Sequence, residues 1–83
     1  MTLVRSRRWT VEIAGLEDCY WQSYQVECAW IDFWQPAGMD GVIVQSVSLW
    51  GKPWGEEIAA LDILNVRDNA PDWLRKLIEE HRP

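Results

Sequence analysis

An alternation of apolar and polar residues runs through much of the chain, and it limits the fold more than any other feature. It is clearest over residues 8–14, where Trp9, Val11 and Ile13 fall on one side of an extended backbone. Because successive side chains of a strand point to opposite faces, this pattern predicts a half-buried β-strand. Residues 42–51 predict another strand, with Ile43, Val47 and Leu49 on one of its sides.

Between these segments, residues 19–35 are rich in aromatic and β-branched side chains, which favours one long strand. In its first half the even positions are mainly apolar and the odd positions mainly polar, whereas from Ala29 onward both sides are apolar apart from Asp32. Either a β-bulge changes the alternation, or both faces of this end are covered. Turn-forming residues at 15–18 and 35–41 separate the three strands.

Residues 58–66 fit two periods. Apolar residues at every third position from Ile58 to Leu64 fit a helix, whereas those at every second position from Ala59 to Ile63 fit a strand. We expect a strand over 58–66, because a strand that returns beside its predecessor is the simpler topology.

The last segment carries a clear helical pattern. Pro71 suits the first helical position, and Asp72 suits the first turn, where a negative charge is favourable. One stripe of this helix is apolar and the other side is charged. The stripe consists of Trp73, Leu74, Leu77, Ile78 and His81. A helix of this length is marginal alone, so we expect it to dock on the sheet.

The 83 residues suffice for one domain. We expect residues 1–83 to form a single small α+β domain, an antiparallel β-meander of three or four strands with one C-terminal α-helix packed on one face. Residues 1–7 are expected to be a flexible basic N-terminus. The chain has no apolar run of membrane-spanning length and no apolar stretch suited to a secretory signal at its start, so we expect no membrane association.

The two cysteines bear on the compartment. On one continuous strand, Cys19 and Cys28 are about 30 Å apart at roughly 3.3 Å per residue, too far for a disulfide. A turn after Asp18 relaxes this argument. Free thiols are typical of a reducing environment, so we expect a cytoplasmic protein.

The charge is uneven along the chain. The net charge is −5, and between Trp9 and Val66 there are nine acidic residues and one basic residue, Lys52. Such a field repels phosphate backbones, so we expect no nucleic-acid binding, and it attracts a basic partner. The alternative is that these acids only keep a tryptophan-rich protein in solution.

Catalytic patterns are weak. His81 is the single histidine, and neither cysteine lies near it in sequence. Two cysteines nine residues apart match no common zinc spacing. The acid pairs 17–18 and 56–57 are typical of solvated turns. The glycines form no phosphate-binding loop. We therefore predict that the protein is not an enzyme and has no metal or cofactor site.

Seven of the 83 residues are tryptophan, a residue enriched at binding surfaces because its ring can be dry while its N–H stays wet. Trp9 and Trp73 are expected to join the first strand to the helix in the core. Large aromatics occupy both parities of the long strand, and one short helix covers one face. The alternative is that the loop 50–55 covers the second face. The residues expected to contact a partner are Trp21, Trp30, Phe33, Trp34, Trp50 and Trp54, with the acids Glu27 and Asp32.

The last 14 residues, from Ala70 to Pro83, read APDWLRKLIEEHRP. This segment resembles the C-terminal helix of small uncharacterised proteins of actinobacteria and their phages. The resemblance covers a helix start and an amphipathic stripe and carries across no catalytic residue. It implies a hypothesis about function, since small acidic phage proteins can act as stoichiometric inhibitors of host proteins, including defence nucleases. Such inhibitors present carboxylates where DNA phosphates would lie.

These observations lead to one leading hypothesis, a small acidic protein-binding module that is a homodimer, with a phage-encoded inhibitor of a host defence protein as its sharpest form. One alternative is a small-molecule binding protein with a pocket lined by Trp30, Trp34, Trp50 and Trp54. The other is a purely structural homodimer.

Overall fold

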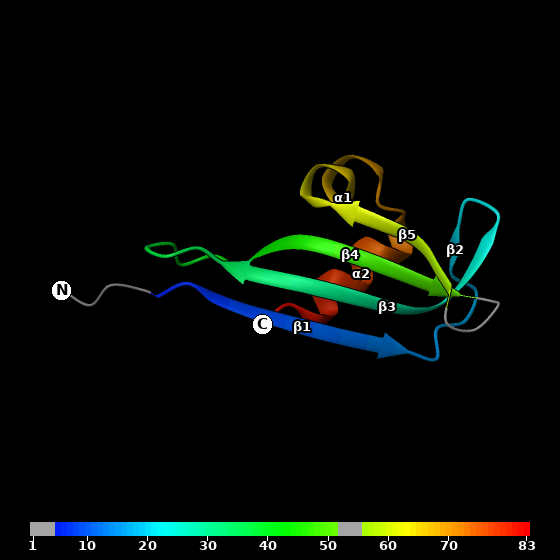
Figure 1. The fold of residues 1–83 in the computed structure, drawn as a ribbon, viewed down its shortest axis with the longest axis horizontal. Helices are drawn as coiled ribbons and strands as arrows, with labels where there is room; N and C mark the ends of the chain where they lie inside the picture. The colour runs from blue at the N-terminus through cyan, green and yellow to red at the C-terminus, as the bar shows by residue number, and fades with distance from the viewer. Residues whose placement is uncertain (1–4, 52–55) are drawn as a thin grey trace.

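The computed structural model describes residues 5–51 and 56–83. An antiparallel sheet with the strand order β1-β3-β4-β5 forms the body of the molecule, and a short β2 pairs with the start of β3 (Figure 1). The elements are β1 (Arg7–Ala14), β2 (Tyr20–Trp21), β3 (Tyr24–Gln35), β4 (Ile43–Gly51), β5 (Glu56–Asp62), α1 (Ile63–Asn69) and α2 (Asp72–His81). The predicted α+β meander with a C-terminal helix is confirmed.

The expected single strand over 19–35 is wrong. The chain turns at Gln22 and Ser23, and Gln22 adopts a left-handed φ of 56°. The hairpin sets β2 against the start of β3, and the carbonyl of Cys19 accepts a 2.8 Å hydrogen bond from the amide of Val26. Cys19 and Cys28 are therefore not separated by an extended strand, and both are free thiols.

Of the two alternatives for the long strand, a β-bulge or an end covered on both faces, the structure shows a β-bulge, which lies just before Ala29. The register with β4 shifts between Val26 and Cys28, which leaves Glu27 as an extra residue. Val26 therefore packs in the same core as Ala29, three positions along, although a regular strand places them on opposite faces.

Because of a second bulge, Ile43 lies on the other face of the sheet from the one expected. The register between β3 and β4 shifts again between Asp32 and Phe33, with Gln45 as the extra residue of β4. Ile43 therefore pairs with Trp34, on the face of the sheet opposite to that of Val47, although the two were expected to share a face.

The strand expected over 58–66 is half right. β5 pairs back antiparallel onto β4, but it ends at Asp62, and α1 begins at Ile63. The Asp62 carboxylate accepts a 2.8 Å hydrogen bond from the amide of Asn65, which caps the helix. This local cap ends the strand, and α1 follows directly, so each of the two periods that the sequence offered describes part of this segment.

The N-terminal boundary also differs from the expectation. Arg7 opens β1 and pairs with Gln35, and the Ser6 hydroxyl accepts a 2.9 Å hydrogen bond from the Trp34 indole. The sheet therefore begins at Arg7, the last residue of the arm 1–7 that was expected to be flexible.

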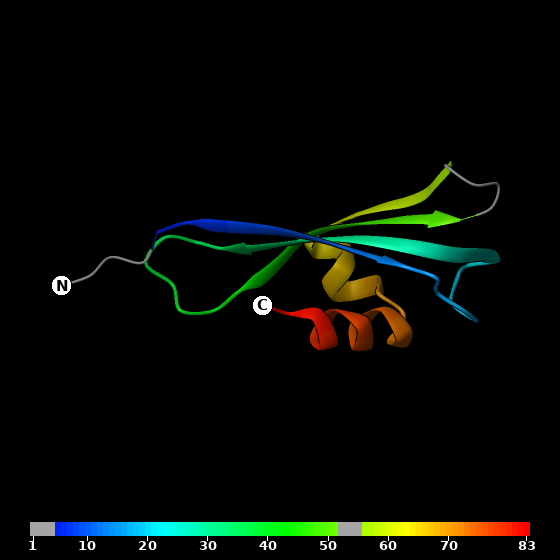
Figure 2. The ribbon, with the colours of Figure 1, turned by 90° about the horizontal axis from the view of Figure 1, so that it is seen from below.

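Both helices lie on one face of the sheet (Figure 2). α2 buries Leu74 and Ile78, and α1 buries Val66, against an apolar sheet face. The fully buried side chains of largest volume are Phe33, Ile31, Leu49, Leu74, Val26 and Val47. Trp9 and Trp73 pack against this core as expected, but both stay partly exposed. No helix among the described residues is long and apolar enough to cross a membrane.

Two side chains of α2 hold neighbouring elements in place. The Trp73 indole donates a 2.9 Å hydrogen bond to the carbonyl of Tyr20, which ties α2 to β2. The Arg75 guanidinium donates to the carbonyls of Ala70 and Arg67, at 3.0 and 3.3 Å, and so satisfies backbone acceptors at the end of α1.

Candidate functional site

The face of the sheet opposite the helices is the candidate site, and it is called the open face below. Along each strand, every second side chain points into the core, and the side chains between them point to the opposite surface. Residues that are paired in register on neighbouring strands lie on the same surface, so these intervening side chains together form the open face. Its register-paired residues are Arg8, Thr10, Glu12 and Ala14 on β1, Cys28, Trp30, Asp32 and Trp34 on β3, Ile43, Ser46, Ser48 and Trp50 on β4, and Glu57, Ala60 and Asp62 on β5.

A hydrogen-bonded ladder crosses the centre of the open face. Asp32 lies between Thr10 of β1 and Ser46 of β4 in register. Each of its carboxylate oxygens accepts one hydroxyl hydrogen bond of 2.8 Å, one from Thr10 and one from Ser46. The acid that was expected to contact a partner therefore also links three strands.

Beside this ladder, four open-face residues form a notch of about 220 Å³. Glu12 faces Trp30, and Cys28 faces Trp50, on adjacent positions of neighbouring strands. Trp30 is 42% exposed, which is high for so large an apolar side chain. The Trp50 indole nitrogen is buried and has no hydrogen-bond partner, alone among the side-chain N and O atoms of the described residues. An unsatisfied buried donor of this kind costs about 1–3 kcal/mol.

The Cys28 thiol forms the floor of the notch. Its side chain is buried, with 3% of its surface exposed, and its Sγ lies 4.0 Å from a Glu12 carboxylate oxygen. Burial, and after it the negative charge of Glu12, raises the pKa of Cys28, while a contact with Trp30 lowers it by less. The thiol is therefore protonated and weakly nucleophilic at neutral pH.

Trp34 occupies the far end of the open face. The Arg8 guanidinium carbon lies 6.0 Å from the centroid of the Trp34 ring, within cation–π range, and the indole N–H is bonded to Ser6. The Trp34 ring of this face therefore already has a cation of the same chain, the Arg8 guanidinium, beside it.

The structure divides the residues that were expected to contact a partner. Trp30, Trp34, Trp50 and Asp32 lie together on the open face. Phe33 is 0% exposed in the core, so its assignment to a partner surface is wrong, because it shares a face of β3 with Ala29 and Ile31 and the helices cover that face. The others are scattered: Trp21 packs against the core from the helix side, Glu27 is the bulge residue, and Trp54 lies outside the described residues.

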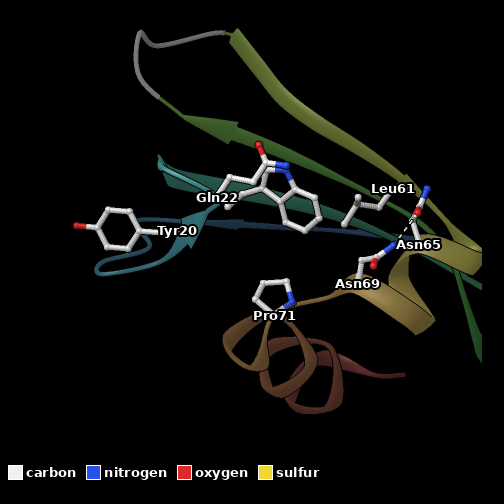
Figure 3. A pocket seen from close by; sticks show the side chains of 7 residues that line it. Tyr20, Gln22, Leu61, Asn65, Asn69 and Pro71 are labelled. Carbon is white, nitrogen blue, oxygen red and sulfur yellow. Dashed lines mark hydrogen bonds between the residues drawn. The ribbon is translucent and has the colours of Figure 1, made fainter.

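A larger cavity of about 470 Å³ lies on the helix side, between the β2 hairpin and α1 (Figure 3). Asn65 and Asn69 line it from α1, and the Asn69 amide donates a 3.0 Å hydrogen bond to Asn65. Gln22 adds a third amide, and Leu61 and Pro71 add apolar surface. This cavity could not be predicted from the sequence, because 58–66 was expected to be strand and 19–35 one unbroken strand.

Sequence reasoning also missed Glu12 and Cys28 as parts of the notch. Both lie on strands in which successive side chains point to opposite faces, so the face of each could be predicted. The residues beside them on the neighbouring strands depend on the register. The register in turn depends on bulges whose positions periodicity does not give.

Groups suited to catalysis or metal binding are dispersed. His81 ends α2, and its Nδ1 lies 2.9 Å from the carbonyl of Leu77. No three His, Cys, Asp or Glu side chains of ranges 5–51 and 56–83 gather in a geometry that could hold a metal ion.

Comparisons with known proteins found no relative: no protein-family model matches the chain. No curated protein matches it either. No solved structure matches its fold.

Proposed function

We propose that this protein is a protein-binding module that holds a basic partner protein against its open face. The observation that carries the proposal is the pairing of Trp30, an exposed indole, with the Glu12 carboxylate directly opposite it on β1. Exposed tryptophan at the centre of a surface is a frequent source of binding energy in protein interfaces. A neighbouring carboxylate favours Lys or Arg side chains from the partner.

Charge supports a basic partner. Among the register-paired residues of the open face, four are acidic, namely Glu12, Asp32, Glu57 and Asp62, and one, Arg8, is basic. The whole chain has the same sign, with a net charge of −5. This field slows the approach of nucleic acid and speeds the approach of a positively charged protein surface. A second copy stacked on the same face would set acid against acid, so the partner on this face is a different protein.

An inhibitor of a host enzyme is one specific form of this proposal. An acidic face can occupy the basic groove in which a nuclease holds DNA phosphates. The cytoplasm is the proposed location, because Cys19 and Cys28 are free thiols. If the partner is a nuclease, a DNA duplex and this protein should compete for it, and a duplex that binds alongside the protein would reject this form alone.

A small-molecule site is the second candidate, and the notch favours it. Trp30 and Trp50 line this cavity together, whereas Trp34 lies at the other end of the face. Of the four tryptophans expected to line a pocket, Trp54 lies outside the described residues, and Trp30 and Trp50 lie together beside the Glu12 carboxylate. Two indoles and a carboxylate suit a small organic cation. Tryptophan fluorescence during titration with tetramethylammonium chloride tests this, and a response in wild type that Glu12→Gln abolishes is expected for such a site.

The proposed function is tested by affinity capture with matched bait variants. Wild type, Trp30→Ser and Tyr24→Ser are immobilised and exposed to a lysate of the organism that carries the gene. Tyr24 is a suitable control because it is 55% exposed but pairs with Trp21, away from the open face. We expect a basic protein to be retained by wild type and Tyr24→Ser, to be lost by Trp30→Ser, and to elute with salt.

Two results would count against the proposal. A set of captured proteins that is the same for wild type and Trp30→Ser would show that the open face is not the binding surface. A captured partner that is acidic, or whose binding does not weaken as salt increases, would reject the role of the carboxylates.

A further inference from the structure

β1 is an edge strand of the sheet. It pairs with β3 on one side, and no described strand pairs with its other side. Its core-facing side chains Trp9, Val11 and Ile13 are only half buried, whereas their register partners on β3 are fully buried. The core is therefore incompletely covered along this edge, and the backbone groups of the edge can accept another strand.

The sequence of β1 is complementary to itself when it is read antiparallel about Thr10. Arg8 and Glu12 lie at equal distances on either side of Thr10, and so do Trp9 and Val11. We propose that two copies of this chain pair through β1, antiparallel, about a two-fold axis at Thr10, to form one continuous sheet. This proposal does not require the function proposed for the open face, although the two share Glu12.

This axis creates favourable pairs on both faces, and on the helix side it also sets Arg7 of each copy opposite Ile13 of the other. On the helix side, Trp9 of each copy lies opposite Val11 of the other, and an aromatic beside a β-branched residue is a stabilising cross-strand pair. On the open face, Arg8 of each copy lies opposite Glu12 of the other, which gives two pairs of opposite charge. Because the axis is perpendicular to the sheet, helix side meets helix side, and the half-buried edge of each core becomes covered.

The other edge strand lacks this complementarity. A two-fold axis at Ala59, the centre of β5, would set Glu56 of each copy opposite Asp62 of the other. Like charges directly opposite each other destabilise a strand pair. The charge pattern therefore selects β1 rather than β5 for pairing between copies.

The same arrangement brings a cation to the notch. Glu12 faces Trp30, and its carboxylate lies 4.0 Å from the Cys28 Sγ. It takes part in neither of the ion pairs seen in the described part of the chain, Arg67–Asp68 and Arg82–Glu79. In the proposed dimer, Arg8 of the second copy lies opposite this carboxylate. The notch would then be completed by a side chain from the other copy.

Position 10 gives a direct test by disulfide trapping. Residues that face each other across a two-fold axis in an antiparallel pair have Cα atoms about 4.5–5.5 Å apart, which is within disulfide range. We expect Thr10→Cys to form a disulfide-linked dimer under mild oxidation. Wild type, with its native Cys19 and Cys28, and an Ala60→Cys variant on β5 are the controls and should stay mostly unlinked.

Exchanging the charges at positions 8 and 12 gives a second test. Its result can be interpreted even if each single variant is locally less stable. Sedimentation equilibrium should give the mass of two chains for wild type, and Arg8→Glu or Glu12→Arg should each weaken dimerisation at least several-fold. The double variant Arg8→Glu/Glu12→Arg should restore it, because the two charges are exchanged but remain opposite. Glu56→Arg on β5 should leave the dimer unchanged.

Several results would overturn the proposal. A single-chain mass up to millimolar concentration would exclude the dimer. A dimer that ignores both single charge reversals, or that Thr10→Cys does not trap, would show that copies meet through another surface. A double variant that is as weak as the single variants would show that Arg8 and Glu12 act within one chain.

Discussion

The Thr10 hydroxyl donates a 2.8 Å hydrogen bond to the Asp32 carboxylate, directly across the boundary between β1 and β3. The second carboxylate oxygen of Asp32 accepts an equal bond from Ser46 of β4. One side chain therefore fixes the lateral order of three strands on a face that carries no helix. The exposed Trp30 indole of this face is held on a rigid base, which reduces the entropic cost of binding a partner.

Removal of this ladder should weaken the fold. Asp32→Ala leaves both hydroxyls without their acceptor, and we expect the free energy of unfolding to fall by about 1–2 kcal/mol, since the site is only half buried. Urea denaturation measures it, with Asp40→Ala in the exposed loop before β4 as the matched control. Equal midpoints for the two variants would mean that the ladder contributes nothing to stability.

Gly51 allows the close approach of two strands. A Cβ at this position would overlap the carbonyl oxygen of Gln25 and the Cδ1 atom of Ile58. Because one of these atoms is backbone, Gly51→Ala requires β3 and β4 to move apart, at a cost of about 1–3 kcal/mol. Thermal unfolding should show a clear loss for Gly51→Ala, whereas Gly41→Ala, where nothing lies near, should melt close to wild type.

The Cys28 thiol should react slowly. Its pKa is raised by burial and by Glu12, so little thiolate is present at pH 7. Alkylation by iodoacetamide should be slower at Cys28 than at a thiol of an unfolded peptide, and Glu12→Gln should accelerate it by lowering the pKa. Equal rates in wild type and Glu12→Gln would show that Glu12 has no influence on this thiol.

The same shift predicts a loss of stability in alkali. A thiol whose folded-state pKa exceeds its unfolded value of about 8.5 stabilises the fold fully below that pH. This contribution disappears as the pH rises through the folded-state pKa, because the thiolate must then be buried. Chemical denaturation between pH 7 and 10 should show a smaller decline for Cys28→Ala than for wild type. A decline of the same size in both would exclude Cys28 as its source.

The hydrogen bond between Trp73 and Tyr20 predicts a local effect. Trp73→Phe keeps an aromatic ring against the core but removes the 2.9 Å bond that joins α2 to β2. Hydrogen exchange of the Val26 amide, which bonds to Cys19 in the same hairpin, should become faster, while the Leu49 amide in β4 stays protected. Uniform acceleration at both amides would instead indicate global destabilisation.

The sequence predicted the meander, β1 and α2, because each has a strong period or a recognisable start. Trp9, Val11 and Ile13 do line the helix side of β1, and Pro71 and Asp72 do mark the start of α2. Two local features of the fold were not predicted from the sequence. The left-handed turn at Gln22 has no glycine to mark it, and the Asp62 cap ends a strand whose apolar period continues into α1.

The candidate site was predicted in part, for the same reasons. Trp30, Trp34 and Asp32 share a parity, and β3 has no extra residue among them because the second bulge is on β4, so they stay on one face. Phe33 was placed correctly on the opposite parity but was given the wrong role, because the helices cover that face. Glu12 could not be assigned to Trp30 without the register between β1 and β3.

The most direct test of the open face as a binding surface is to observe its indole groups while the captured basic partner is added. In a ¹⁵N-labelled sample each of the seven tryptophans gives its own Nε1–H signal. We expect the signals of Trp30, Trp34 and Trp50 to shift or broaden, and those of Trp21 and Trp73, on the helix side, to stay unchanged. Binding that moves Trp21 and Trp73 but leaves Trp30 and Trp50 in place would contradict this account.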